Sequence, residues 1–154
     1  MDFENISREG IKMTIVKKTR SVVHSCEQMY NLVNDVESYD DFLPYFEKTV
    51  VHYRDDDEVH ATLVISLGGM QKSFSTRNRL QKNKMIEIRL VDGPFSHLEG
   101  FWRFDDIPTG CEISFDLEFQ FSSRMMAMLL EPFFEQVANK MFDAFCSRAE
   151  SLHG

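Results

Sequence analysis

Residues that could perform acid–base, nucleophilic or metal chemistry are present in this chain, but their spacing assembles no reactive site. The sequence contains no paired-carboxylate motif, no Ser/His/Asp constellation and no glycine-rich phosphate loop. The consecutive aspartates at 55–57 lack the alternating ligands and the glycine of a calcium loop, so we interpret them as a solvated turn. The histidines show no metal-ligand spacing either: His24, His52, His60, His97 and His153. We therefore expect a protein that is not an enzyme and requires neither a metal nor a cofactor.

Cysteine usage and apolar run length indicate where the protein works. The three cysteines, Cys26, Cys111 and Cys146, are odd in number and far apart, which favours a reducing compartment over a disulfide framework. Cys26 lies at the expected start of a helix, where a thiol pKa can fall, so a reactive thiol is one alternative. No run approaches the length of a membrane span, and residues 1–12 lack the basic and apolar regions of a signal peptide. These features predict a cytoplasmic protein.

The chemistry that the sequence does favour is the binding of something apolar. Fourteen phenylalanines and nine methionines among 154 residues can fill a large core, or they can line a pocket because such side chains adapt to irregular shapes. Residues 111–121 alternate apolar and polar side chains, which predicts a long strand with one dry face. Residues 124–152 then follow helical periodicity. Their apolar stripe consists of Met126, Leu130, Phe133 or Phe134, Val137, Met141, Phe145 and Leu152.

This strand and the helix that follows it are matched in length, at roughly 35 and 40 Å. A curved sheet can therefore hold the apolar stripe of the helix against its dry face, and the space between them is where a ligand would bind. Pro132 is expected to kink the helix, which would suit a movable entrance to that space; a harmless bend is the alternative.

The remaining pattern predicts one α+β domain over residues 13–154, after a flexible polar extension over residues 1–12. Ser25 and Gln28 form a capping box before the first of two short helices, and Pro44 ends the second. These helices are expected over residues 26–35 and 37–42, and six further strands over residues 14–23, 47–54, 58–67, 70–81, 85–91 and 97–106. The result is seven consecutive antiparallel strands, with the two short helices after the first and the long helix at the end.

Strand alternation assigns side chains to the dry face and so to the candidate pocket. Gly100 lies between large residues and leaves room for a ligand. Thr76 and Asn78 share a face with Phe74, so a buried polar pair could bind a ligand carbonyl; cross-strand hydrogen bonding is the alternative. The apolar candidates could also simply pack against the helix. The candidate lining residues are Ile88, Leu90, Leu98, Gly100, Trp102, Phe104, Phe115, Leu117, Phe119, Phe133 and Val137.

Charge is distributed unevenly along the chain. The net charge of −8 argues against general nucleic-acid binding. One segment, residues 72–89, nevertheless carries six basic residues and a single acid, Glu87, which gives a local charge of +5. This segment is either a solvated face of the sheet or a docking patch for RNA, anionic lipid or an acidic protein. Its basic residues are Lys72, Arg77, Arg79, Lys82, Lys84 and Arg89.

Three segments carry a resemblance to a known family. Residues 38–46 read SYDDFLPYF, residues 73–80 read SFSTRNRL and residues 91–104 read VDGPFSHLEGFWRF. In order and spacing they resemble the coenzyme-Q-binding START-like family of the polyketide cyclase/dehydrase-like superfamily, and within it the bacterial branch of ribosome association toxins. The resemblance extends over about residues 13–152. It implies the helix-grip fold, a seven-stranded curved antiparallel sheet wrapped around a long C-terminal helix, with two short helices between strands 1 and 2.

The resemblance also implies where the site lies. The tryptophan that matches Trp102 belongs to the cavity-side motif of the family, and its flat ring is suited to stacking on a quinone head. In this fold the second short helix borders the cavity mouth, and we expect a rigid loop at the rim of the sheet. The residues expected there, some of them as a hydrophobic lip for a membrane or a partner, are Tyr39, Phe42, Leu43 and Pro44 in the helix, with Pro94 and Phe95 in the loop.

Two functions follow from the resemblance. One is the binding of an isoprenoid quinone such as ubiquinone, or a related lipid, by a carrier or chaperone that supports respiration and contacts the inner membrane transiently. The other is that of a toxin-like factor that binds the 50S ribosomal subunit and blocks formation of the 70S ribosome, with the basic segment as its contact surface. We expect the first function, in a monomer, with the quinone or lipid as ligand and no required cofactor.

Overall fold

The computed structural model describes residues 10–154, which form a single seven-stranded antiparallel sheet and a small set of helices. The strands are β1 (Thr14–Val22), β2 (Phe46–Arg54), β3 (Glu58–Leu67), β4 (Met70–Gln81), β5 (Met85–Asp92), β6 (Phe95–Ile107) and β7 (Gly110–Phe121). The helices are α1 (Cys26–Asn34), the 3-10 helix η2 (Val36–Ser38), α2 (Tyr39–Phe42) and α3 (Arg124–His153). The sheet order β1-β7-β6-β5-β4-β3-β2 places β1 beside the last strand. The predicted α+β helix-grip fold is confirmed.

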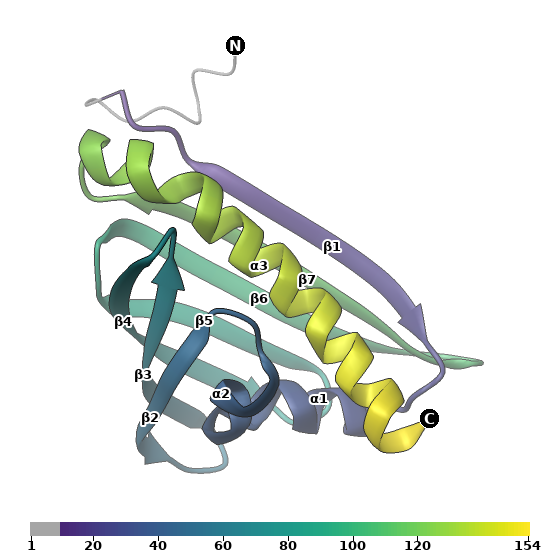
Figure 1. Cartoon of the computed structure of the whole chain (residues 1–154). Helices are drawn as coiled ribbons and strands as arrows, with labels where there is room; N and C mark the ends of the chain where they lie inside the picture. Colours follow the sequence, from purple (N-terminus) through teal and green to yellow (C-terminus); the bar gives the residue numbers. More distant parts are fainter. Residues whose placement is uncertain (1–9) are drawn as a thin grey trace.

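The long helix α3 crosses one face of the sheet, and α1 and α2 lie on the same side (Figure 1). In β7, alternate side chains from Cys111 to Phe121 are buried, as the sequence pattern predicts. At the start of α3, the hydroxyl of the N-cap Ser123 accepts a hydrogen bond from the backbone N–H of Met126 at 3.1 Å. The helix continues through Pro132, which has no N–H and so leaves one helix carbonyl without its donor. Pro132 is exposed, so water can donate a hydrogen bond to that carbonyl.

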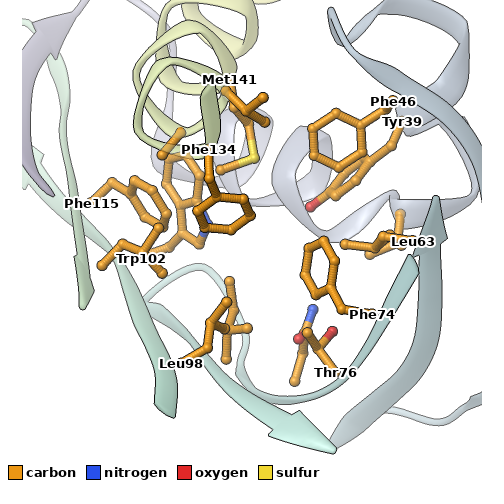
Figure 2. A pocket seen from close by; sticks show the side chains of 16 residues that line it. Tyr39, Phe46, Leu63, Phe74, Thr76, Leu98, Trp102, Phe115, Phe134 and Met141 are labelled. Atoms are coloured by element: carbon orange, nitrogen blue, oxygen red, sulfur yellow. The ribbon is translucent and has the colours of Figure 1, made fainter. Parts of the chain in front are cut away.

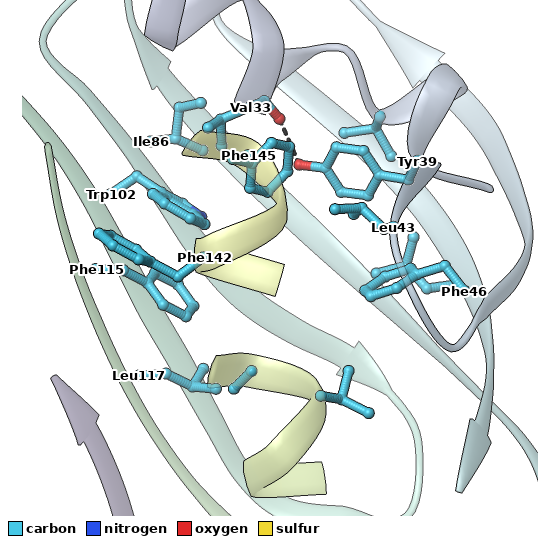
Figure 3. Packing of buried hydrophobic residues seen from close by; sticks show 14 of the residues in the cluster. Val33, Tyr39, Leu43, Phe46, Ile86, Trp102, Phe115, Leu117, Phe142 and Phe145 are labelled. Atoms are coloured by element: carbon cyan, nitrogen blue, oxygen red, sulfur yellow. Dashed lines mark hydrogen bonds between the residues drawn. The ribbon is translucent and has the colours of Figure 1, made fainter. Parts of the chain in front are cut away.

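The connection between β1 and β2 differs slightly from the prediction. The capping box is present: the Ser25 hydroxyl accepts from the N–H of Gln28 at 3.1 Å, and Oε1 of Gln28 accepts from the N–H of Ser25 at 3.0 Å. The expected second helix is divided into η2 and α2. The buried Tyr39 hydroxyl donates to the carbonyl of Val33 and so fastens α2 to the end of α1 (Figure 3).

The loop predicted at the rim of the sheet is wrong at Phe95. The sixth strand begins two residues earlier than predicted, at Phe95 itself, and this side chain is buried. Its ring lies 4.9 Å from that of Phe134, centroid to centroid. This aromatic contact buries apolar surface that a position at the rim would leave exposed to water. Pro94 is half-buried just before the strand, and its carbonyl accepts the N–H of Ser122 at 3.0 Å.

The structure describes only residues 10–12 of the predicted N-terminal extension. Residues 1–9 lie outside the described residues, so flexibility there stays a prediction. Ile11, which we had included in the extension, is buried, and its carbonyl accepts from Nε2 of Gln120 at 2.8 Å. The segment before β1 is therefore held against β7 at Ile11.

Gly110 allows the turn between β6 and β7 to approach the end of β1. Its φ is +151°, and an added Cβ would lie 2.2 Å from the carbonyl oxygen of Val22 and 2.8 Å from the carbonyl carbon of Val23. Both neighbours are backbone atoms, so Gly110→Ala must displace one of the strands. We expect it to lower the free energy of unfolding by about 3 kcal/mol in urea denaturation.

The matched control for this variant is Gly69→Ala. Gly69 also has a positive φ, +84°, but nothing lies within 4 Å of an added Cβ. Only the backbone cost of about 1 kcal/mol should therefore be lost. Equal losses in the two variants would contradict the role assigned to the close approach at Gly110.

Candidate functional site

An apolar cavity lies between the inner face of the sheet and α3 (Figure 2). Side chains from β2 to β7, η2, α2 and α3 form its wall. Its volume is about 60 Å³, which has room for a few water molecules, whereas pockets for drug-sized ligands measure roughly 300–1,000 Å³. The cavity predicted from the pairing of strand and helix therefore exists, with a small volume.

Six of the predicted lining residues border this cavity. They come from three adjacent strands and from the middle of α3, where strand alternation and helical periodicity had placed them. The pairing of Trp102 with Phe115 across β6 and β7 is an example. The six residues are Ile88, Leu98, Trp102, Phe115, Leu117 and Val137. Their position agrees with the prediction, and their contact with a ligand stays a prediction.

Four other predicted residues on the strands do not line the cavity. Gly100 forms part of the wall behind Leu117, since an added Cβ would lie 3.3 Å from Cδ1 of that residue. Phe104 packs edge-on against Tyr30 of α1, with ring centroids 5.7 Å apart. The cavity occupies the middle of the sheet, so inward side chains near the strand ends belong to the core. The four residues are Leu90, Gly100, Phe104 and Phe119.

The prediction for Phe133 is wrong, and its neighbour takes the place. Phe133 is 42% exposed and packs over Gly68, where an added Cβ would meet the ring at 2.6 Å. Phe134 is buried and lines the cavity. Successive helix residues differ by about 100° in direction, and the buried stripe of α3 drifts around the helix axis beyond Pro132. Periodicity alone therefore did not separate the two phenylalanines.

Trp102 is almost completely buried and is not free to stack on a ligand. Its ring stacks on that of Phe115 with centroids 4.2 Å apart, and it lies parallel to the ring of Phe142 at 6.0 Å. Phe145 contacts it edge-on at 5.3 Å (Figure 3). These rings occupy the positions that a quinone head would need. The expected stacking platform is therefore corrected to a rigid aromatic wall.

Thr76 and Asn78 of β4 place polar groups in this apolar wall. They are 4% and 7% exposed and both border the cavity. Oδ1 of Asn78 has no hydrogen-bond partner among the described residues. Its cross-strand neighbours are Val59 and Ile88, whose side chains donate no hydrogen bond, so the cross-strand alternative fails for this atom. An acceptor left unpaired in the interior costs roughly 1–3 kcal/mol.

Several residues of the cavity wall were absent from the prediction. Leu63 and Phe74 lie on inward phases of β3 and β4; alternation had placed Phe74 on the inner face, but neither residue was included in the predicted lining. Phe46 and Val36 lie at element starts, where no periodic signal extends. The residues that were missed are Val36, Phe46, Leu63, Phe74, Phe134, Ala138 and Met141.

The residues predicted for the cavity mouth are less exposed than a lip would be. Tyr39 lines the cavity itself, and Leu43 is buried in the core. Phe42 and Pro44 are half-buried. Phe42 packs edge-on against Phe145 of α3, with ring centroids 5.6 Å apart. The short helix α2 therefore closes the cavity against α3.

The helix α3 is fastened to the sheet by polar groups along one side. Within the described chain, its side-chain hydrogen bonds and ion pairs to other elements all reach β1 or the segments next to it. They are Thr14–Glu131 at 2.8 Å, Lys18–Asp143 at 3.1 Å, Arg20–Asp143 at 2.9 Å and His24–Glu150 at 3.1 Å. Burial alone would raise the pKa of Asp143, but hydrogen bonds from Lys18 and Arg20 hold it below its ordinary value.

On its other side, α3 meets α2, β3 and β4 through rings and aliphatic groups. Phe134 lies edge-on to Phe74 at 5.9 Å, and the guanidinium of Arg148 lies 5.1 Å from the ring centre of Phe42. Apolar contacts are non-directional, whereas hydrogen bonds weaken steeply when their geometry changes. The two sides of α3 therefore differ in kind, with directional polar bonds toward β1 and mainly non-directional contacts toward α2 and β3.

The basic segment does not form one continuous patch. Lys72 lies opposite Ile65 across β3 and β4, on the inner face of the sheet, because alternate residues of a strand point to opposite faces. Acidic residues of the same strand or of a neighbouring strand pair with two of the outward arginines: Arg77–Glu58 at 2.9 Å, Arg89–Glu87 at 2.7 Å and Arg89–Glu99 at 3.0 Å. Among the described residues, Arg79, Lys82 and Lys84 are exposed and take part in none of the ion pairs.

The reactive-thiol alternative at Cys26 is wrong. Cys26 is buried, and burial, together with the neighbouring Cys111, raises the pKa of its thiol. The thiol therefore stays protonated at neutral pH, in spite of its place at a helix N-terminus.

Folding brings together one cluster that linear spacing did not show. Ligand atoms of His97, Glu99 and Glu118 lie within 4.8 Å of one another on the outer face of β6 and β7. Nε2 of His97 lies 3.1 Å from Glu118, and Arg89 donates to Glu99 at 3.0 Å. These groups are satisfied by one another, so we assign no metal to them.

The family and the relatives that this chain matches are consistent with its fold and its apolar cavity. Residues 22–146 match the family described as polyketide cyclase/dehydrase and lipid transport. The chain is 37% identical to the ribosome association toxin RatA of Escherichia coli K12 over 144 residues, which cover 93% of this chain and 91% of that protein. It is 27% identical to the mitochondrial coenzyme Q-binding protein COQ10 of Drosophila melanogaster over 142 residues, which cover 89% of this chain and 59% of that protein.

Solved structures share the fold. The aromatase/cyclase Zhui from Streptomyces sp. R1128 superposes with a TM-score of 0.79 at 19% identity, covering 90% of this chain and 94% of that one. A START superfamily protein from Mycobacterium smegmatis gives a TM-score of 0.72 at 20% identity, covering 90% and 98%. At these identities the likeness concerns the fold alone. With the family match over most of its length, the chain belongs to the polyketide cyclase/dehydrase and lipid transport family, of START-like fold.

Proposed function

We propose that this protein binds an isoprenoid quinone such as ubiquinone, or a related lipid, in the cavity and carries it in support of respiration. The observation that carries the proposal is the wall of the cavity, which is apolar except for a few polar side chains, two of them together on β4. The description of the family includes lipid transport, and one relative is named for binding coenzyme Q. Burial of apolar ligand surface would contribute about 25 cal/mol per Å², before the costs of binding.

The cavity must widen to admit such a ligand, since its volume is about 60 Å³. In this proposal, α3 separates from α2 and β3 while its bonds to β1 hold. Such a movement breaks ring and aliphatic contacts, such as that between Phe42 and Phe145, and preserves the pairs of Asp143 with Lys18 and Arg20. The apolar surface exposed by the movement is the surface that the ligand then covers.

Exposed apolar side chains at the start of α3 suit exchange of ligand with lipid. Met125, Met128 and Leu129 are between 52% and 80% exposed, on the first turns of the helix. We place the protein in the cytoplasm as a monomer that touches the inner membrane only transiently, through this end of α3. Among the described helices, none combines the length and the apolar character needed to cross a membrane.

Filling the cavity should prevent ligand uptake. Ala138→Leu enlarges a lining side chain, and Val137→Phe is a second blocking variant at the adjacent lining position. Native mass spectrometry with lipid extraction, on protein purified from a quinone-producing bacterium, should show near-stoichiometric ubiquinone in the unchanged protein and little in either variant. Gln136→Leu, at an exposed position of the same helix, is the control and should retain the ligand.

Two results would overturn the carrier proposal. One is an unchanged protein that is purified empty and does not take up added ubiquinone. The other is full occupancy in both blocking variants, with circular dichroism showing that they are folded. The second result would place the ligand outside the cavity.

A second candidate function is ribosome association, as a factor that binds the 50S subunit and blocks formation of the 70S ribosome. Its support is the relative named ribosome association toxin RatA, together with the exposed cations at the end of β4 and in the turn to β5. Arg79, Lys82 and Lys84 are free to meet phosphates, whereas Arg77 and Arg89 are engaged with carboxylates. Binding through phosphates releases counterions and therefore weakens steeply with salt, unlike the burial of a lipid.

Charge reversal at that turn distinguishes the two functions. If ribosome association operates, Arg79→Glu with Lys82→Glu and Lys84→Glu should abolish co-sedimentation with 50S subunits and leave ubiquinone binding unchanged. Lys17→Glu with Lys48→Glu and Lys140→Glu changes the net charge equally at other exposed sites and is the control. Co-sedimentation that survives the first triple variant, or that is insensitive to salt, would exclude this surface.

A further inference from the structure

The buried amide oxygen of Asn78 lacks a hydrogen-bond partner within the described part of the chain. Val59 and Ile88 flank Asn78 across the sheet. Thr76, two residues earlier on the same strand face, also borders the cavity. Figure 2 shows Thr76 on the sheet side of the cavity, next to Phe74. This polar corner therefore lies in the wall of the cavity, next to the space that a ligand would occupy.

Hydrogen-bond accounting decides which ligand group fits this corner. A side-chain amide offers both donors and an acceptor, and a threonine hydroxyl offers one donor and two acceptor sites. A ligand carbonyl only accepts, so it can pair with a donor of the corner but leaves the amide oxygen unpaired. A ligand hydroxyl donates and accepts, so it can pair with both kinds of group. In the amide orientation of the structure, the oxygen is the atom without a partner among the described residues.

We propose that Thr76 and Asn78 form a subsite that selects a ring hydroxyl, so that phenols and quinols bind in preference to quinones and O-alkylated rings. The inference rests on the proposed function, since it names the ligand class for the same cavity. The polar head then lies against β4, and the apolar remainder of the ligand lies along α3, where Val137 and Met141 line the wall. For a quinone and its quinol, the reduced form is the one bound more tightly.

Desolvation strengthens this selection. In the free protein the amide oxygen is already covered and unpaired among the described residues, so a ligand that offers a donor removes this cost. A ligand without a donor leaves the acceptor buried and unpaired, which is the more expensive outcome in a low-dielectric wall. The binding preference therefore depends on whether the ligand carries a hydrogen-bond donor, more than on the size of its ring.

The test uses a pair of probes that differ only by a methyl group on the ring oxygen, 4-octylphenol and 4-octylanisole. Trp102 is the sole tryptophan and lies in the cavity wall, so its fluorescence reports occupancy in the full chain. We expect the phenol to bind about tenfold more tightly than the anisole, which corresponds to one hydrogen bond gained and one acceptor satisfied. Asn78→Leu should reduce this ratio to near one, chiefly by weakening the phenol.

Controls separate the failure of this inference from the failure of the proposed function. Thr76→Val is close in shape, so it tests the corner even if Asn78→Leu does not fold, and it should also lower the ratio. Ser73→Ala, at an exposed position of β4, should leave it unchanged. If both probes bind with equal affinity, or if the ratio survives both variants, the inference is wrong and the lipid cavity stands. If neither probe binds, nor does ubiquinone, the proposed function fails as well.

Discussion

One long helix has to cover one face of a curved sheet, and the rest of the structure depends on this constraint. The dry face of β7 requires an apolar cover, and α3 follows it after only a short connection. A helix presents a narrow stripe, whereas the sheet face is several strands wide, so α1, α2 and η2 cover part of what remains (Figure 1). Rings such as Phe142 and Phe145 fill the space next to Trp102. Where no side chain reaches, the small cavity is left.

The two sides of α3 are held to the rest of the fold by different kinds of contact. Charged and hydroxyl groups hold the helix to β1, where a small displacement would lose directional bonds. Ring contacts close the opposite side, where sliding costs less. The outward cations lie at the end of β4 and in the turn to β5, and none of them lines the cavity. A ligand inside and a partner outside would therefore use separate surfaces of the sheet, and the two candidate functions do not compete for the same side chains.

The sequence predicted the architecture because its signals were local and repeated. Alternation over β7 and helical spacing over α3 each extend over many residues, so the fold and most strand bounds agreed with the structure. The site was predicted less completely, because it depends on contacts between distant segments. Adjacent Phe133 and Phe134 differ by one step of a drifting stripe, and Phe95 is drawn into the core by Phe134. Charge pairs such as Arg77 with Glu58 depend on strand register, which no local pattern encodes.

The burial of all three cysteines has a practical consequence for measuring how the helix moves. Burial raises the pKa of Cys26, Cys111 and Cys146, so their thiols are almost unreactive while the fold is closed. Cys146 lies on α3 beside Arg20 of β1, on the side that polar bonds hold, and gains access to solvent when this attachment opens or the helix unfolds locally. The rate at which the native thiols react with a thiol reagent therefore measures how often these openings occur. A cysteine introduced on the surface could carry a spectroscopic label without removal of the native ones.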